Sequence, residues 1–337
     1  MNDFISMVKY HQSEKIPVWF MRQAGRYMKL YQDIRKDNTI REICMNPELT
    51  ERITYEPVKL LGVDSAIIFA DIILPLEAMG YKIGFNSNGP VIENGYTDNR
   101  EMKNIHEFEY KSLKYRTVDA IKLFKEKHKT PLIGFSGGIV TILSYIISGK
   151  SDSNLLKTKK VMFNDEAFKS YVKLIKEMII EYLKIQVKSG VDAIQIFDSW
   201  LGSISPYAFN KYLKNDVMEI INEFKGKIPI IYFSTGTSGI VDELRDTGPD
   251  FISIDWRIKL SNVRKMIGNN IGLQGNLDPY TVSYNQNEAI HETKDILGNL
   301  KNHDNYIFNL GHGVLPETDE NTLKEITELI HNYKQKR

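Results

Sequence analysis

Residues 17–27 read PVWFMRQAGRY. Apolar residues come first, as in a short buried strand, and the segment then changes to two arginines, Arg22 and Arg26, on either side of Gly25. A strand that ends in such a loop places two positive charges at the edge of a core, and the planar fork of a guanidinium matches carboxylates and phosphates. The same spacing also suits two arginines on the exposed face of a helix. The rest of the chain has to decide between these interpretations.

Length and composition limit the class of protein. The chain has 337 residues, 42% of them apolar, which suits one α/β barrel or two smaller domains with a large core. A net charge of +1 argues against nucleic acid as a partner but permits a local cationic site. The single cysteine, Cys44, excludes an internal disulfide and a metal site built from several cysteines.

The amino-terminal residues lack the pattern of a signal peptide, and no apolar run is long enough to span a membrane. We therefore expect a cytoplasmic protein without a membrane partner. A processed organelle protein is the alternative.

Eight short apolar segments recur along the chain with helical patterns between them. They are almost continuously apolar, as parallel strands buried on both faces are. The expected strands cover residues 16–20, 65–70, 131–135, 193–197, 229–233, 251–254, 271–274 and 306–310. Eight strand–helix units favour a single-domain (β/α)8 TIM barrel over residues 1–337, with a doubly wound open sheet as the main alternative.

The expected helices alternate with these strands. They cover residues 47–61, 164–189, 206–224, 260–267, 288–300 and 319–333. Asn-Gly pairs at 88–89 and 94–95 predict a hairpin inserted within residues 81–96.

Polar side chains follow nearly every expected strand, at the barrel end where active sites lie. In chain order they are Arg22 and Arg26, Asp71, the 134–138 glycine turn with Tyr145 beyond it, Asp198-Ser199, Asp255-Trp256-Arg257, Gln274 to Asp278, and His312. The glycine turn suits either an anion cradle or a simple bend. Asp71 suits either a helix cap or contact with a cationic or N–H-rich ligand, since burying its charge alone is costly.

These motifs resemble those of the uroporphyrinogen decarboxylase family. In family order they are PVWFMRQAGRY (17–27), AIIFADI (66–72), AMG (78–80), GFSGG (134–138), FDSW (197–200), QGNLDP (274–279) and FNLGHG (308–313). The resemblance extends over nearly the whole chain. It implies a (β/α)8 barrel, usually a homodimer, that needs neither metal nor cofactor. Its substrate would be a tetrapyrrole, uroporphyrinogen III, whose four acetate carboxylates are removed to give coproporphyrinogen III in heme biosynthesis.

The resemblance also implies site residues. The catalytic residues would be Asp71, Tyr145, His312 and Arg22, and the substrate-binding residues Arg22, Gln23, Arg26, Arg35, Asp71, Tyr145, Phe197, Ser199 and His312. Decarboxylation needs an electron sink, and a pyrrole protonated beside the acetate can serve as its own. Asp71 would then oppose the cationic ring, and the arginines would bind carboxylates. The proton donor stays open among His312, Tyr145 and Arg22.

The sequence departs from the family pattern at several positions. Ile139-Val140 replaces a usual Pro-Trp, Thr235 replaces a usual lysine, and no proposed catalytic side chain is lost. One alternative is the zinc-dependent methyltransferase branch that shares this barrel, but its thiolate-rich zinc site cannot be built with one cysteine. The other is a non-catalytic tetrapyrrole-binding barrel, suggested by the altered wall near Ile139.

Overall fold

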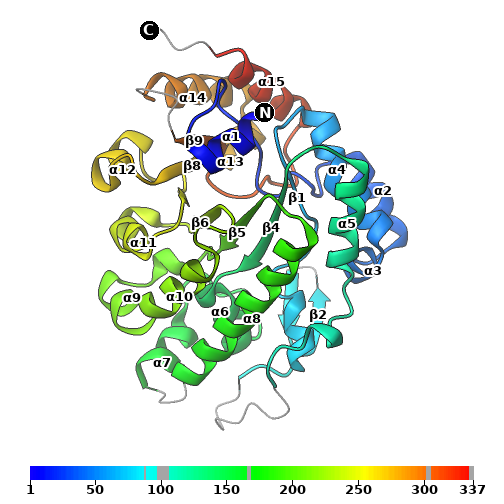
Figure 1. Ribbon diagram of the computed structural model, residues 1–337, viewed down its shortest axis with the longest axis vertical. Coiled ribbons are helices and arrows are strands. Elements are labelled where there is room, and N and C mark those ends of the chain that lie inside the picture. The colour runs from blue at the N-terminus through cyan, green and yellow to red at the C-terminus, as the bar shows by residue number, and fades with distance from the viewer. Residues whose placement is uncertain (87–88, 97–105, 165–167, 301–304, 334–337) are drawn as a thin grey trace.

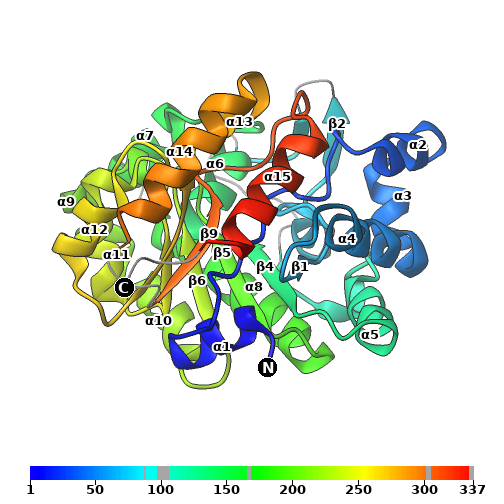
Figure 2. The same ribbon diagram turned by 90° about the horizontal axis from the view of Figure 1, so that it is seen from above.

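In the computed structural model, residues 1–86, 89–96, 106–164, 168–300 and 305–333 are described. Seven strands form one parallel sheet, and each strand pairs with the next in the order β1-β4-β5-β6-β7-β8-β9. They are β1 (Ala66–Ile67), β4 (Leu132–Gly137), β5 (Ala193–Phe197), β6 (Ile230–Phe233), β7 (Phe251–Ser253), β8 (Gly272–Leu277) and β9 (Tyr306–Leu310). Figures 1 and 2 show this sheet curled in the middle of the molecule with helices around it. The α/β class with a parallel sheet is confirmed.

The first expected strand, residues 16–20, is not a strand, and that prediction is corrected. Val18 forms an isolated parallel bridge with Phe308 of β9. On its other side, Val18 O accepts the backbone N–H of Asp64, the residue two before β1 (2.9 Å). A regular ladder does not form because Pro17 has no N–H to donate and Val18 N–H donates to the Asp64 carboxylate (2.7 Å). The segment thus bonds to β9 on one side and to a residue before β1 on the other, and among the described residues the sheet itself has seven strands and not the expected eight.

Helices cover the outer side of the sheet. They are α1 (Asp3–Tyr10), α2 (Lys29–Asp37), α3 (Ile40–Met45), α4 (Pro47–Leu61), α5 (Thr117–Lys127), α6 (Ile139–Ser148), α7 (Leu156–Asn164), α8 (Phe168–Ser189), α9 (Pro206–Tyr212), α10 (Lys214–Phe224), α11 (Val241–Thr247), α12 (Leu260–Ile267), α13 (Pro279–Tyr284), α14 (Gln286–Gly298) and α15 (Glu320–His331). The predicted helices 47–61 and 260–267 are confirmed to the residue. Helix 206–224 is two helices that meet at Leu213.

The predicted hairpin is present between β1 and β4. Strand β2 (Ile83–Asn86) pairs antiparallel with β3 (Gly89–Ile92), and residues 87–88 of its turn lie outside the described residues. The Asn94 side chain accepts the N–H of Lys82 (2.6 Å) and donates to Gly80 O (3.0 Å), which closes the base of the hairpin.

A buried polar network ties the segment after Pro17 to the far strands. Trp19 Nε1 donates to Gln274 Oε1 (3.0 Å), and Gln274 Nε2 donates to Gln195 Oε1 (3.0 Å) and Ser253 Oγ (2.9 Å). Buried polar groups with matched partners fix side-chain positions. The network therefore fixes the start of the arginine loop relative to β5, β7 and β8. Within the part of the chain that is described, no helix has both the length and the apolar content to cross a membrane.

Candidate active site

The arginine loop, residues 21–26, is held by β9 and the segment after it. The N–H of Met21 donates to Asn309 Oδ1 (2.9 Å), and Met21 O accepts from Val314 N–H (2.8 Å). Arg22 has φ 59°, a left-handed conformation uncommon for residues other than glycine, and it is exposed. Among the described residues, none forms a hydrogen bond or ion pair with its guanidinium. The loop therefore presents an unpaired positive charge at the carboxyl edge of the sheet.

Asp71 follows β1 and precedes the 3-10 helix η1 (Leu74–Met79). Its Oδ1 accepts the N–H of Ile73 (3.1 Å), whereas no described residue donates a hydrogen bond to Oδ2. Burial raises the pKa of Asp71, and the Ile73 N–H and the charge of Arg22 oppose that rise. One oxygen thus caps a turn and the other is free for a ligand.

Tyr145 lies on α6 and is almost buried, with its ring 5.2 Å from that of Trp200. Burial and the charge of Asp71 raise the pKa of Tyr145 to about 12, while Arg22 opposes the rise. The charge of Arg22 thus acts on Asp71, which follows β1, and on Tyr145, which lies on α6. The phenol keeps its proton at neutral pH.

Asp198, in the FDSW motif, has a role that the motif did not predict. Its fully buried carboxylate accepts the N–H (2.7 Å) and hydroxyl (2.9 Å) of Thr141, the N–H of Val140 (3.3 Å) and the hydroxyl of Tyr232 (3.0 Å). Burial raises the pKa of Asp198, and these bonds oppose the rise. The carboxylate fixes the first turn of α6, and hence Tyr145, to the end of β5. The available signal was an aspartate directly after a buried strand.

The expected glycine turn at 134–138 is corrected: residues 134–137 belong to β4, and Gly138 is the cap residue of α6 that makes room for this carboxylate. A Cβ atom at Gly138 would lie 2.3 Å from Asp198 Cβ and 2.4 Å from its Cγ. Gly138→Ala is therefore expected to lower the free energy of unfolding by about 1–3 kcal/mol, as overpacking does. Gly298→Ala is the control, because nothing lies within 4 Å of a Cβ at that helical position. Urea unfolding of both variants measures the difference, and equal stabilities would contradict the assignment.

An aromatic row lies along the strand ends. Ring centroids are 5.5 Å apart for Phe135 and Phe197, 5.8 Å for Phe197 and Phe233, and 5.9 Å for Phe233 and His312. Each neighbouring pair is steeply tilted, an arrangement that aromatic rings favour. The row connects the predicted residue Phe197 to His312 through the buried ring of Phe233.

His312 is half-buried in the loop after β9. The N–H of Gly313 donates to His312 Nδ1 (2.7 Å), so we assign the ring proton to Nε2. Burial lowers the pKa of His312 to about 3, and the charges of Arg22 and Arg257 add to the effect. At neutral pH the imidazole is uncharged and donates through Nε2.

The lowered pKa of His312 predicts a pH dependence of stability. The unfolded state binds the proton near the ordinary pKa of 6.5, whereas the folded state resists it down to about 3. The contribution of neutral His312 to the free energy of unfolding should therefore be fully present above pH 6.5, and it should be lost as the pH is lowered from 6.5 towards 3. His312→Gln should flatten this part of the curve. Unfolding free energies of both proteins between pH 3 and 8 measure it; parallel curves would contradict the assignment.

Gln23 does not line an open site. Its side chain is fully buried, Oε1 accepts Phe20 N–H (3.0 Å), and Nε2 donates to Ser65 O (3.0 Å). Both amide groups are thus used inside the protein, and Gln23 fixes the arginine loop to the start of β1. The expected substrate contact is corrected to this supporting role.

Arg26 and Arg35 lie close enough to Tyr31 for their charges to act on it. The charges of both arginines oppose the burial that raises the pKa of Tyr31. Arg26 is exposed, whereas the half-buried Arg35 donates to Asn38 O. Arg26, at the end of the arginine loop, and Arg35, on α2, therefore place two positive charges around Tyr31.

The residues that depart from the family pattern pack or bond inside the protein. Ile139 and Val140 are both buried at the start of α6, so they belong to the core. The hydroxyl and N–H of Thr235 donate to Ser199 O (2.6 and 3.2 Å), which fixes the loop that carries the predicted Ser199. Thr235 thus has a structural role in place of the usual lysine.

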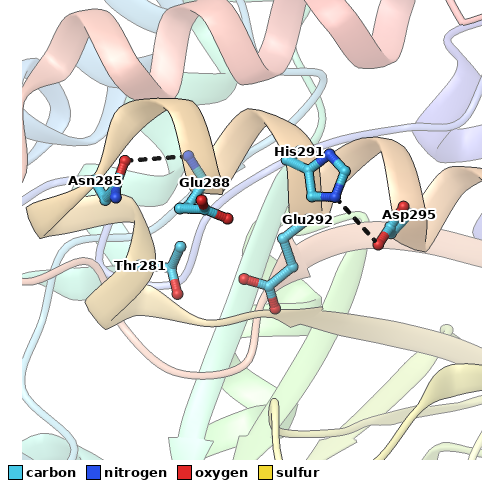
Figure 3. A pocket seen from close by; sticks show the side chains of 6 residues that line it. All are labelled: Thr281, Asn285, Glu288, His291, Glu292 and Asp295. Atoms are coloured by element: carbon cyan, nitrogen blue, oxygen red, sulfur yellow. Dashed lines mark hydrogen bonds and ion pairs between the residues drawn. The ribbon is translucent and has the colours of Figure 1, made fainter.

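Two surface hollows lie elsewhere. One of about 510 Å³ lies between α13 and α14 and is lined by Thr281, Asn285, Glu288, His291, Glu292 and Asp295 (Figure 3). The other, of about 370 Å³, borders the hairpin and includes Arg41 and Glu77. Neither contains a residue that the sequence predicted for the site. In the described ranges, no three His, Cys, Asp or Glu side chains group as a metal site would require.

The fold and these residues define an α/β protein with a candidate active site at the carboxyl edge of a parallel sheet. The family model for uroporphyrinogen decarboxylase (URO-D) matches residues 1–333. The uroporphyrinogen decarboxylase of Picrophilus torridus is 54% identical over 335 residues, covering 99% of this chain and 100% of the relative. That of Thermoplasma acidophilum is 43% identical over 334 residues, covering 98% and 99%. The chain belongs to the uroporphyrinogen decarboxylase family.

Solved structures show the same fold at low identity. A methyltransferase from Methanosarcina mazei superposes with a TM-score of 0.82 at 20% identity and covers 97% of each chain. The putative vitamin-B12-independent methionine synthase from Listeria monocytogenes gives a TM-score of 0.57 at 12% identity, covering 95% of this chain and 97% of that one. These likenesses concern the fold alone.

Proposed function

We propose that this protein is a uroporphyrinogen decarboxylase, a carboxy-lyase that removes the four acetate carboxylates of uroporphyrinogen III to give coproporphyrinogen III. The family match carries the proposal. The observation on the site that supports it best is the juxtaposition of Asp71, with one free oxygen, and the unpaired guanidinium of Arg22. The carboxylate suits pyrrole N–H groups, and the guanidinium suits a substrate carboxylate.

The chemistry follows from the charges. Protonation of a pyrrole carbon beside the acetate gives a cationic ring. CO2 then leaves, and the electron pair of the broken bond neutralises the ring as an exocyclic methylene forms. Protonation of that methylene and loss of the proton first added to the ring carbon give the methyl group and restore the pyrrole. A negative charge fixed near that ring stabilises the cation as it forms. Asp71 has this role in the proposal, and the N–H groups of the bound pyrroles replace the hydration that burial removes from it.

The remaining residues bind and orient. Arg22 and Arg26 bind substrate carboxylates, and Arg35 extends this positive edge beside Tyr31. Neutral His312 donates through Nε2, and Ser199 and Phe197 orient and pack against the macrocycle. At neutral pH Tyr145 keeps its phenol proton, and His312, whose pKa is lowered to about 3, is an uncharged imidazole with its one ring proton on Nε2.

The proposal includes a single-domain, closed (β/α)8 barrel in which residues 17–19 occupy the eighth position, and a cytoplasmic homodimer that needs no cofactor. The Val18 bridge to Phe308 supports the barrel. The dimer and the compartment rest on the family resemblance, and the mass of the protein in solution tests the dimer.

The direct test is product formation. Purified protein is incubated anaerobically with reduced uroporphyrinogen III, and the macrocycles are separated by carboxylate number. Appearance of the four-carboxylate product with release of CO2 supports the proposal. The oxidised macrocycle is the control, since its conjugated ring no longer has isolated pyrroles to protonate. Tight binding without turnover would favour the non-catalytic tetrapyrrole-binding alternative.

A methyltransferase activity has less support. The zinc-dependent enzymes of this fold need thiolates, and the chain has one cysteine. Cys44 is buried, and burial with the charge of Asp71 raises its pKa to about 12. It is therefore a protonated core residue.

A further inference from the structure

Arg257 follows β7 and is held in one orientation by its neighbours. Its Nη1 donates to Asp255 Oδ2, and its backbone N–H donates to Asp255 Oδ1 (3.3 Å). Asp255 is itself fully buried and accepts the N–H of Gly236 (2.7 Å). A guanidinium bonded to a fixed carboxylate loses part of its rotational freedom before any ligand arrives.

The flat face of the guanidinium is also fixed. The central carbon of Arg257 lies 4.2 Å from the ring centroid of Trp256, and that ring is 6.0 Å from the ring of Tyr280. Stacking uses the face of the guanidinium and leaves its N–H edge available. About half of the side chain (51%) is exposed, and no described residue other than Asp255 accepts a hydrogen bond from it.

Packing around the loop after β9 places Arg257 at the site. A Cβ atom at Gly311 would lie 2.6 Å from Trp256 N, and one at Gly313 would lie 2.4 Å from Arg22 Cδ. The loop of residues 311–313 is therefore pressed between Trp256 and Arg22. Arg257 and Arg22 lie on opposite sides of this loop, and the charges of both act on His312 between them.

We propose that Arg257 is a third carboxylate-binding arginine of the site, which uses the N–H edge that Asp255 leaves free. The inference rests on the proposed function, which supplies an octacarboxylate ligand. Because Arg257 and Arg22 are separated by the 311–313 loop, they bind carboxylates on different side chains of the macrocycle. Asp255 and Trp256 act as positioning residues for this contact.

A purely structural role for Arg257 makes different predictions. It would require only a positive charge beside the buried Asp255, and a lysine at this position would satisfy it. A bidentate contact with a carboxylate needs the fork and fails with lysine as well as with glutamine. The pair Arg257→Gln and Arg257→Lys therefore separates the two roles.

The experiment measures steady-state decarboxylation and thermal unfolding of both variants. We expect KM for uroporphyrinogen to rise about tenfold in each, with kcat changed by less than about threefold, as loss of one charge-assisted contact implies. Arg245→Gln is the matched control, because Arg245 pairs with Asp242 (2.7 Å) and Asp246 (2.8 Å) on α11, and its kinetics should be unchanged. An unchanged KM in Arg257→Gln, or full rescue by lysine, overturns the proposal.

A binding measurement separates this inference from the proposed function. Affinity of the wild-type protein and of Arg257→Gln for uroporphyrin, the oxidised octacarboxylate, is followed by fluorescence whether or not turnover occurs. Weaker binding by Arg257→Gln supports the contact even if wild-type protein forms no product, in which case only the proposed function fails. Equal affinities overturn the contact.

Discussion

Asp71→Asn is expected to lower kcat by about 10²–10³-fold while KM stays within a few-fold of the wild-type value. The reason is that asparagine keeps the shape and the hydrogen bond to Ile73 N–H but removes the negative charge. Removing one fixed electrostatic partner of a transition state has effects of this size in other enzymes. A ground-state contact would instead raise KM.

Thermal unfolding of Asp71→Asn tests whether the loss of activity comes from a loss of stability. Burial raises the pKa of Asp71, so the folded state holds the proton more tightly than the unfolded state does. Protonated Asp71 therefore contributes to the free energy of unfolding below the ordinary pKa of an aspartate. This contribution is lost as the pH rises through the raised pKa of the folded protein. At neutral pH the charge is a cost, and Asp71→Asn should unfold at the same temperature as the wild type or a higher one.

The control for this prediction is Asp192→Asn. Asp192 precedes β5 at the opposite edge of the sheet, where its carboxylate accepts from Lys125 Nζ (2.7 Å) and Leu132 N–H (2.8 Å). Its loss should reduce stability and leave kcat unchanged. If Asp71→Asn keeps more than about a tenth of wild-type kcat, Asp71 is not the group that opposes the cationic ring.

Local signals in the sequence were sufficient for much of the fold. Helix 47–61 was predicted with both ends correct because Asn46 caps it through Leu49 N–H and Gly62 ends it in the left-handed conformation. Strand 193–197 was also exact, since a β-branched apolar run bounded by polar residues is itself the signal. These features depend on neighbours in the chain.

The failures involve bonds between residues far apart in the sequence. Val18 N–H donates to an Asp64 side chain 46 positions away, and this replaces the ladder that residues 16–20 were expected to form. Asp198 accepts from Thr141 across 57 positions, which made it a support for α6. A pattern of apolar and polar residues indicates that a carboxylate follows a strand. It does not indicate which backbone N–H groups will meet that carboxylate.

Gln23 shows the same limit within the site. The motif at 17–27 located the arginine loop correctly, but it could not show whether the amide of Gln23 faces outward or inward. The structure turns it inward, onto Phe20 N–H and Ser65 O. Neighbouring residues of one motif therefore divide into those with free groups, such as Arg22, and those that hold the loop.

Arg22→Lys is expected to lower kcat/KM about 100-fold, the second large effect. The guanidinium is unpaired among the described residues, and its charge acts on Asp71, Tyr145 and His312. Two charge-assisted hydrogen bonds to a substrate carboxylate, at about 1.5 kcal/mol or more each, correspond to this factor. Lysine keeps the charge but is a compact point charge without the fork.

The position of the guanidinium can be tested separately from its chemistry. A Cβ atom at Gly313 would lie 2.4 Å from Arg22 Cδ, so Gly313→Ala should displace the arginine stem without changing its charge. We expect this variant to share most of the loss in kcat/KM, whereas Gly239→Ala, with nothing within 4 Å of its Cβ, should behave as wild type. If alanine at 313 leaves kcat/KM unchanged while Arg22→Lys lowers it, the site tolerates a moved guanidinium. The left-handed backbone at Arg22 and the packing of Gly313 would then serve the loop's stability and not the alignment of substrate.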